Sequence, residues 1–275
     1  MQPRSLPPAA ALVATVPACS NDTAAPNAFS DSDIALLTPD LSAGAVAGQA
    51  SLPGLTMDAG AFFPAFGTAG LPSVLGRGLR DHCTYLPTAG RFLCDPVRRD
   101  GLLISRSFAF YDADGKPQST RNDDTRSMNT QIVVTGTLRR DSENPVHVDR
   151  KSDMTVSGLG PSSTQHTLNG SERGKTEAVR NSDRGTWTVT TNFASSTKDV
   201  VIQVPRTEDA WPLSGSIIVE ASIKATLMNG SASRSRSYRE EVTFNGTNTV
   251  PVKITRGDVT KECTRDLETH KTTCP

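Results

Sequence analysis

The sequence is poor in aromatic residues and has no excess of charge of either sign. Aromatic residues make up 5% of the 275 residues, and 29 lysines and arginines balance 29 aspartates and glutamates. Proteins that bind nucleic acid generally carry a basic excess or stripe, so the formal charge of zero argues against a nucleic-acid partner. No uninterrupted apolar run reaches about 18 residues, so we expect no segment to cross a bilayer as a helix.

Motifs typical of enzymes are missing as well. The sequence has neither the HExxH pattern of a metalloprotease nor the GxSxG pattern of a nucleophile elbow. His147 stands between two valines in a stretch that alternates, so we interpret it as a strand residue that faces solvent. The other histidines, His82, His166 and His270, are scattered along the chain. We therefore predict no catalytic residues, no metal site and no cofactor.

The first residues have the organisation of an export signal. Arg4 supplies a positive charge, a short apolar stretch follows, and a small-residue boundary precedes Cys19. The tetrapeptide Val16-Pro17-Ala18-Cys19 resembles the lipobox of bacterial lipoproteins, in which the cysteine is diacylated and becomes the mature N-terminus. This resemblance implies a signal peptide over residues 1–18 and lipidation of Cys19. Residues 19–75 would then form a lipidated tether and an irregular arm rich in Ala, Gly and Pro.

The resemblance also implies a location. A diacylated cysteine would anchor the protein in a membrane of the bacterial cell envelope, facing the periplasm or the cell surface. It leaves open whether that membrane is the inner or the outer one.

The remaining cysteines support export independently. Cys83 and Cys94 are separated by ten residues, as are Cys263 and Cys274. A hairpin that turns in the middle of such a segment places its two cysteines on adjacent strands, within the short span of a disulfide. We therefore predict the pairs Cys83–Cys94 and Cys263–Cys274, although four cysteines allow three connectivities. A zinc site would need closely spaced cysteine pairs, which the sequence lacks.

The clearest structural signal is an alternation of apolar and polar residues. In residues 217–227 every second residue is apolar, from Ile217 to Leu227, which predicts a long half-buried strand. Turn signals separate this run from similar ones, because a type I′ hairpin turn favours Asn-Gly. These signals are Asn169-Gly170, Asn229-Gly230 and Asn245-Gly246, with further turns at Asp112 to Gly115, Asp183 to Gly185 and Arg256 to Asp258.

Together these patterns predict an all-β domain over residues 76–275. We expect an antiparallel up-and-down β-meander of long hairpins, preceded by the irregular N-terminal arm. No amphipathic helix pattern is present to cover the apolar face of such a sheet. The sheet must therefore curl on itself, pack as a two-layer sandwich or form an open barrel.

One basic segment is a candidate binding patch. The stretch Ser233–Ser237 places Arg234 and Arg236 on one face of a strand, and Arg239 follows. These arginines could bind an anionic ligand or a lipid headgroup. The alternative is a solvated strand face whose charges discourage edge-to-edge pairing.

These observations favour a non-enzymatic envelope lipoprotein. Its partners would be the membrane, through the lipid anchor, and an apolar ligand, a lipid or another envelope protein on the β-sheet body. The alternative is a surface adhesion or carbohydrate-binding module, for which the tyrosines and tryptophans are too dispersed in sequence to define a face. An enzyme whose catalytic groups converge from distant strands is the third hypothesis.

Overall fold

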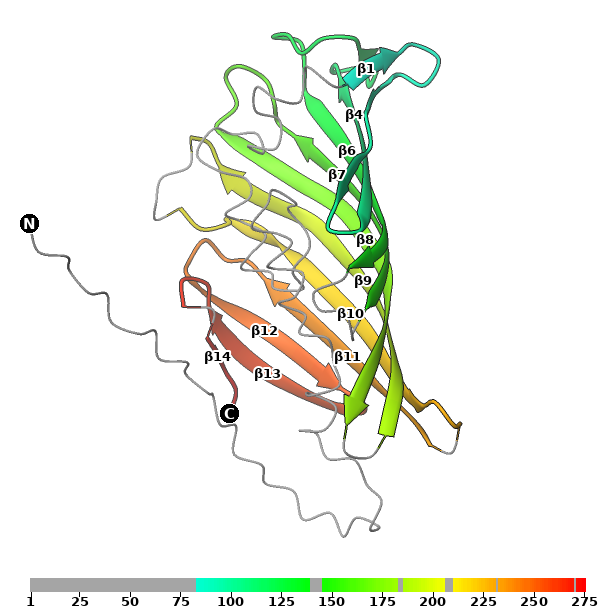
Figure 1. Ribbon diagram of the computed structural model, residues 1–275. Coiled ribbons are helices and arrows are strands. Elements are labelled where there is room, and N and C mark those ends of the chain that lie inside the picture. The colour runs from blue at the N-terminus through cyan, green and yellow to red at the C-terminus, as the bar shows by residue number, and fades with distance from the viewer. Residues whose placement is uncertain (1–82, 139–144, 183–184, 206–209, 231, 270) are drawn as a thin grey trace, which may run out of the picture.

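The computed structural model describes residues 83–138, 145–182, 185–205, 210–230, 232–269 and 271–275 (Figure 1). Within these residues the chain forms 14 strands in one antiparallel sheet and no helix, so none that could cross a membrane. The predicted signal peptide, Cys19 and the arm up to residue 75 lie outside the described residues. The strands are β1 (Cys83–Leu86), β2 (Arg91–Cys94), β3 (Val97–Arg99), β4 (Leu102–Tyr111), β5 (Pro117–Gln118), β6 (Ser127–Leu138), β7 (Val146–Ser157), β8 (Gln165–Ser182), β9 (Gly185–Gln203), β10 (Ser214–Leu227), β11 (Ser233–Thr243), β12 (Thr249–Arg256), β13 (Val259–Asp266) and β14 (Thr272–Thr273).

The predicted up-and-down meander is confirmed. Each long strand pairs with the next one along the chain, from β6 through to β14, and only the short β3 and β5 lie off this path, both paired with β4. Of the three arrangements that the sequence left open, the structure has a single sheet that curls strongly without closing (Figure 1). Consecutive pairing follows from the tight turns, because a short connection returns the chain beside the strand it has just left.

The alternation predicted for residues 217–227 defines the two faces of the sheet. Ile217, Val219, Ala221 and Ala225 are buried, whereas Glu220 between them is exposed. Residues directly opposite one another in a β-ladder share a face, so the register extends this assignment across the sheet. We call the face that carries Ile217 and Val219 the inner face and its opposite the outer face.

Most of the predicted turns are confirmed. Asn229-Gly230 lies between β10 and β11, and Arg256-Gly257-Asp258 joins β12 to β13. The stretch from Asp112 to Gly115 is a turn in which the Asp112 carboxylate accepts hydrogen bonds from two backbone amides, at 2.8 and 3.0 Å. Asn245-Gly246 likewise follows β11 and precedes β12.

The hairpin predicted at Asn169-Gly170 is wrong. These residues lie inside β8, where the register with β9 shifts between Leu168 and Gly170. The Asn169 side chain bonds the backbone amide of Asp199 at 2.8 Å and the Asp199 carboxylate at 3.1 Å. Asp199 has a positive φ of 49°. The bulge is therefore on β9, where Lys198 and Asp199 together face Asn169, and Asn-Gly lies in a continuous strand opposite it.

Both predicted disulfides are present. The sulfur atoms of Cys83 and Cys94 are 2.10 Å apart, and those of Cys263 and Cys274 are 2.01 Å apart. Cys83 and Cys94 lie directly opposite one another in the pair of β1 with β2, and the second bond joins Cys263 of β13 to Cys274, which directly follows β14. The two pairs are β1 with β2 and β13 with β14, at the two ends of the strand order. Both outermost strands are therefore held covalently to their neighbours.

Candidate functional site

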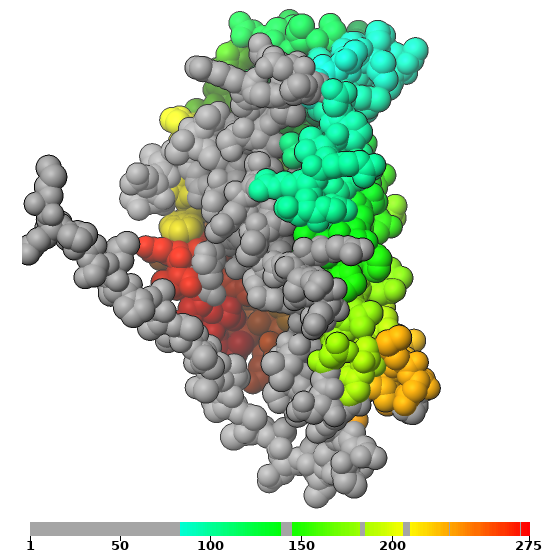
Figure 2. All heavy atoms as spheres, viewed as in Figure 1, coloured from blue at the N-terminus to red at the C-terminus, as the bar shows by residue number. Residues whose placement is uncertain are grey.

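The inner face of the curled sheet carries most of the buried apolar side chains and is the candidate site. Figure 2, in the same view, shows the first strands (cyan to green) and the last strands (red) at opposite sides of the molecule. Apolar side chains connect the two sides along the sheet. The largest buried cluster extends from β6 to the turn after β13 and consists of Met128, Val156, Leu159, Leu168, Val200, Ile217, Val219, Val242, Phe244, Val250, Val252, Cys263 and Leu267.

Aromatic rings gather on the inner face of the first strands. Phe92 stacks on Phe108, with ring centroids 4.6 Å apart, and Phe110 meets both rings edge-on. The ring centroid of Tyr85, on the neighbouring strand β1, lies 5.1 Å from that of Phe92. The sequence separates these residues by up to 25 positions, and the cross-strand register brings them together, so their clustering was not predictable from spacing.

Charge is divided unequally between the two faces. Over strands β4 to β13 the outer face carries seven basic and seven acidic side chains, leaving aside Asp199 in the bulge. Over the same strands the inner face carries eight basic side chains and two acidic ones. The inner-face basic residues are Arg106, Arg150, Arg180, Arg234, Arg236, Arg256, Lys261 and Arg265, and the acidic ones are Glu172 and Glu240.

The first of the two inner-face acids belongs to a buried ion pair. The Arg150 guanidinium donates to the Glu172 carboxylate, and both side chains are about nine-tenths buried. The Phe193 ring covers Arg150, with the guanidinium carbon 5.0 Å from the ring centroid. The ring has room because its cross-strand neighbour is Gly174, where a Cβ would lie 2.5 Å from it. Burial lowers the pKa of Arg150 to about 9, which leaves it charged at neutral pH.

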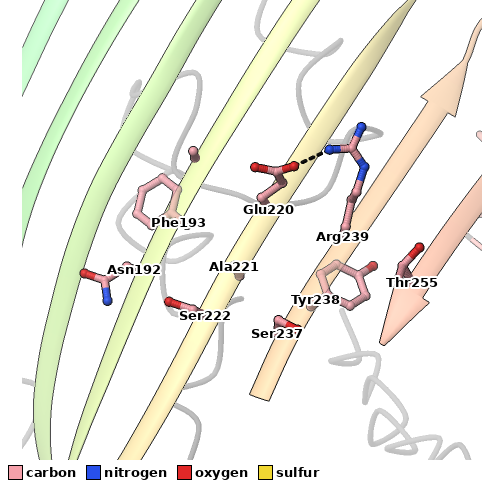
Figure 3. A pocket seen from close by; sticks show the side chains of 10 residues that line it. Asn192, Phe193, Glu220, Ala221, Ser222, Ser237, Tyr238, Arg239 and Thr255 are labelled. Carbon is pink, nitrogen blue, oxygen red and sulfur yellow. Dashed lines mark hydrogen bonds and ion pairs between the residues drawn. The ribbon is translucent and has the colours of Figure 1, made fainter. Parts of the chain in front are cut away.

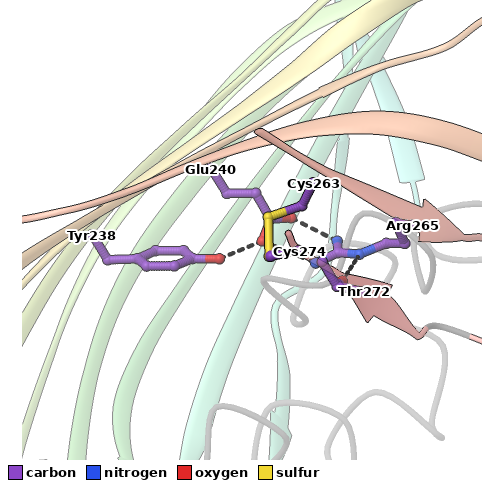
Figure 4. Close-up of a disulfide and its surroundings, with 6 residues drawn as sticks. All are labelled: Tyr238, Glu240, Cys263, Arg265, Thr272 and Cys274. Carbon is purple, nitrogen blue, oxygen red and sulfur yellow. Dashed lines mark hydrogen bonds and ion pairs between the residues drawn. A yellow bond between two sulfur atoms is a disulfide. The ribbon is translucent and has the colours of Figure 1, made fainter. Parts of the chain in front are cut away.

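The carboxylate of Glu240, the second inner-face acid, accepts hydrogen bonds from side chains on two sides (Figure 4). Arg265 donates two hydrogen bonds to its carboxylate, at 2.6 and 3.0 Å, and the Tyr238 hydroxyl donates a third. Arg265 also donates to the Thr272 hydroxyl at 2.9 Å. Burial and the bond to the Glu240 carboxylate raise the pKa of Tyr238 well above its usual value. The Glu240 carboxylate therefore belongs to a hydrogen-bonded network that lies beside the Cys263–Cys274 disulfide.

Four inner-face cations lie together where β11, β12 and β13 meet the hairpin turns. We call Arg234, Arg236, Arg256 and Lys261 the basic corner. Arg256 lies opposite Tyr238, which makes it a diagonal neighbour of Arg236, and Lys261 is in turn diagonal to Arg256. Diagonal neighbours on one face are about 7–8 Å apart, within reach of a common anion for side chains of this length. Arg236, Arg256 and Lys261 are exposed, and Arg234 is half-buried.

The structure divides the basic patch predicted from the sequence. Arg234 and Arg236 share the inner face, as expected, but Arg239 lies on the outer face because it stands three positions after Arg236, and an odd offset changes the face. There it pairs with Glu220 and Glu241. The cations that do join Arg234 and Arg236, namely Arg256 and Lys261, come from other strands. Arg256 and Lys261 can be identified as members of this cluster only from the cross-strand register.

An apolar patch adjoins the basic corner. Arg234 lies directly opposite Ala225, and Arg236 directly opposite Ile223. The corner is therefore next to a strand whose inner face is entirely apolar at this end. We call the following cluster the apolar patch: Trp187, Val189, Ile223, Ala225 and Leu227.

A groove of about 440 Å³ lies over strands β9 to β12 (Figure 3). Seven of its ten lining residues belong to the outer face, among them the small side chains of Ala194, Ser222 and Ser237. The ion pair between Glu220 and Arg239 spans part of it. The groove thus opens on the face opposite the basic corner.

The histidines do not assemble a metal site in the part of the chain that the structure describes. His147 is exposed on the outer face, as predicted, and lies 2.9 Å from the Thr137 hydroxyl. His166 is buried on the inner face, and its Nδ1 has no hydrogen-bond partner among the described residues. Those residues include no group of three or more His, Cys, Asp or Glu placed to hold a metal ion. His82 and His270 lie outside them.

The chain matches no family model, and searches of curated proteins and of solved structures found no match to it either.

Proposed function

We propose that the protein is a non-enzymatic lipoprotein of the bacterial cell envelope whose inner sheet face binds a lipid or another apolar ligand. Cys19 would attach it to the membrane, and the described β-domain would extend from that anchor. The lipobox-like N-terminus and the two disulfides support an oxidising compartment outside the cytoplasm.

The observation that carries the ligand half of the proposal is the open single sheet with an apolar inner face. A sheet with one apolar face normally buries it against a second sheet or a layer of helices. The described residues supply neither, because all their strands belong to one unclosed sheet. An extended apolar face on a curved sheet suits a hydrophobic chain, since such a ligand could take the place of the second layer that the described residues do not supply.

Native mass spectrometry of the mature protein, purified from envelope fractions of its own host, tests both halves. We expect a diacylglyceryl-type addition at Cys19, four fewer hydrogens than in the reduced chain, and a co-purifying lipid. An unlipidated protein that begins at Met1 and has free thiols would overturn the proposed location. A lipidated, disulfide-bonded protein without any ligand would keep the location and contradict lipid binding, in favour of a protein-binding role.

A further inference from the structure

Arg106 is a cation in an apolar part of the inner face. Its inner-face neighbours on β4 are Ile104 and Phe108, and both are buried. Directly opposite it on β6 lies Ile132, which packs against the cluster that contains Ile104. The Arg106 side chain is half-buried, and this burial lowers its pKa below the usual value. The guanidinium is therefore partly withdrawn from water among apolar side chains.

Arg106 has no countercharge among the described residues. Its Nε is buried without a hydrogen-bond partner there, and none of the ion pairs between those residues includes it. In its row of directly opposed inner-face residues the first acid is Glu172, three strands or about 14 Å away at the usual strand spacing. That carboxylate already accepts a hydrogen bond from Arg150. Withdrawing a charge from water without a partner is unfavourable, so an anion at Arg106 would be stabilising.

Aromatic surface adjoins Arg106 on the same face. Phe108 is its neighbour on β4 and stacks on Phe92 of β2. We call the four rings that meet here the ring cluster: Tyr85, Phe92, Phe108 and Phe110. Of these rings only that of Phe108 is buried, and the other three are half-buried and keep accessible surface. A ligand with its anionic group at Arg106 can therefore place a hydrocarbon chain against the ring cluster.

We propose that the ligand of the inner face is a long-chain fatty acid whose carboxylate pairs with Arg106 and whose chain lies along the ring cluster. This inference rests on the proposed function, since it names the class of lipid. Charge complementarity selects the occupant: a guanidinium donates paired hydrogen bonds to the two oxygens of a carboxylate, and one unpaired cation matches one negative charge. An inorganic anion would gain nothing from the rings, and an uncharged lipid would leave the cation without a partner.

The test compares two probes that have the same hydrocarbon chain, dodecanoate and 1-dodecanol. The full chain carries Cys19→Ala, so that no lipid anchor is attached, and binding at neutral pH is measured by isothermal titration calorimetry. We expect dodecanoate to bind about 10- to 100-fold more tightly than dodecanol, which is the factor that corresponds to hydrogen bonds with a charged group.

A matched pair of variants assigns this preference to one residue. Arg106→Gln removes the charge and keeps a polar side chain, so it should lose the same factor of about 10 to 100 for dodecanoate and bind dodecanol unchanged. Arg173→Gln, which removes an exposed arginine from the outer face of β8, should bind both probes as the unmodified protein does. Because Arg106 lacks a countercharge, Arg106→Gln should not lower the midpoint of thermal unfolding, so weaker binding would not reflect misfolding.

A photoreactive probe locates the chain of the ligand. Dodecanoate that carries a diazirine in its chain is cross-linked to the protein, and the labelled peptides are identified by mass spectrometry. We expect labels within residues 83–111, which contain β1 to β4 and the whole ring cluster. Labels confined to other strands would overturn the inference.

The possible failures are distinguishable. Equal affinity for the two probes, or the same loss in both variants, would overturn the fatty-acid inference and leave the proposed function standing, because dodecanol still binds. Binding of neither probe by a protein that co-purifies with a phospholipid would likewise overturn only the inference. Binding of neither probe, with no co-purifying lipid, would contradict the proposed function itself.

Discussion

Loss of the Glu240 carboxylate should destabilise the inner face. The Glu240 side chain is 5% exposed, and its carboxylate accepts hydrogen bonds from Arg265, whose side chain is 11% exposed. With Glu240→Gln that guanidinium stays buried but loses its countercharge, so we expect a loss of about 3 kcal/mol in the free energy of unfolding. Urea denaturation followed by circular dichroism measures it. Glu220→Gln, in an exposed pair with Arg239, is the control and should cost less than about 1 kcal/mol. Equal losses would contradict the prediction.

His166 should make the fold sensitive to acid. Burial, with a smaller contribution from the positive charge of Arg121, lowers its pKa below the usual value. Near pH 6.5 the His166 imidazole therefore becomes protonated in the unfolded chain while it is still neutral in the folded chain. The free energy of unfolding consequently falls as the pH decreases below that value. We expect His166→Gln to flatten this fall by up to about 1.4 kcal/mol per pH unit. Unfolding free energies at pH 7.5, 6.5 and 5.5 measure it. A similar flattening in His147→Gln, which alters an exposed histidine, would refute the assignment.

At the scale of single elements, β8 depends on a glycine beside the position where it faces the β9 bulge. A Cβ on Gly170 would lie 2.4 Å from both the carbonyl oxygen of Asp153 and the sulfur of Met154. The backbone atom cannot move aside cheaply, so we expect Gly170→Ala to destabilise the protein by about 1–3 kcal/mol. Thermal unfolding provides the measurement. Gly160→Ala is the matched control, because its Cβ would meet no atom closer than 3.4 Å and should change stability little.

The same element explains where prediction from the sequence failed. Asn-Gly favours positive φ and a local reversal, and the sequence contains three such pairs with similar neighbours. At Asn229 and Asn245 the following strand starts again close by, whereas at Asn169 the strand continues. The continuous strand is favoured here by β9, whose bulged residue Asp199 donates its backbone amide to the Asn169 side chain. That residue is 30 positions away, so no local pattern could have revealed it.

At the scale of the whole molecule, the sheet should be most stable at its centre. Strands β8, β9 and β10 are the longest and pair on both sides over most of their length, whereas β14 has two residues and a single partner. Amide hydrogen exchange should therefore be slowest in β9 and fastest in β14 and β5. Exchange followed by mass spectrometry resolves these segments. Comparable protection in β9 and β14 would mean that the sheet does not unfold from its edges.

The sequence by itself determined the features that depend on short-range order. Alternation at every second residue predicted the strand at 217–227, and the equal spacing of the cysteines predicted both disulfides. These succeed because a hairpin brings together residues of one short segment, so the partners are already near each other in the chain. The two Arg positions of one strand face were predictable for the same reason, since the side-chain period of a strand is two.

The tertiary structure decided how the strands combine. The curl of an unclosed sheet, the ring cluster of the first strands and the basic corner each join residues from strands whose register the sequence does not state. A shift of one residue in the pairing of β11 with β12 would move Arg256 to the outer face, and one in the pairing of β12 with β13 would move Lys261. The balanced composition of the chain therefore concealed a one-sided distribution of charge, because a net charge counts residues and only the register assigns each of them to a face.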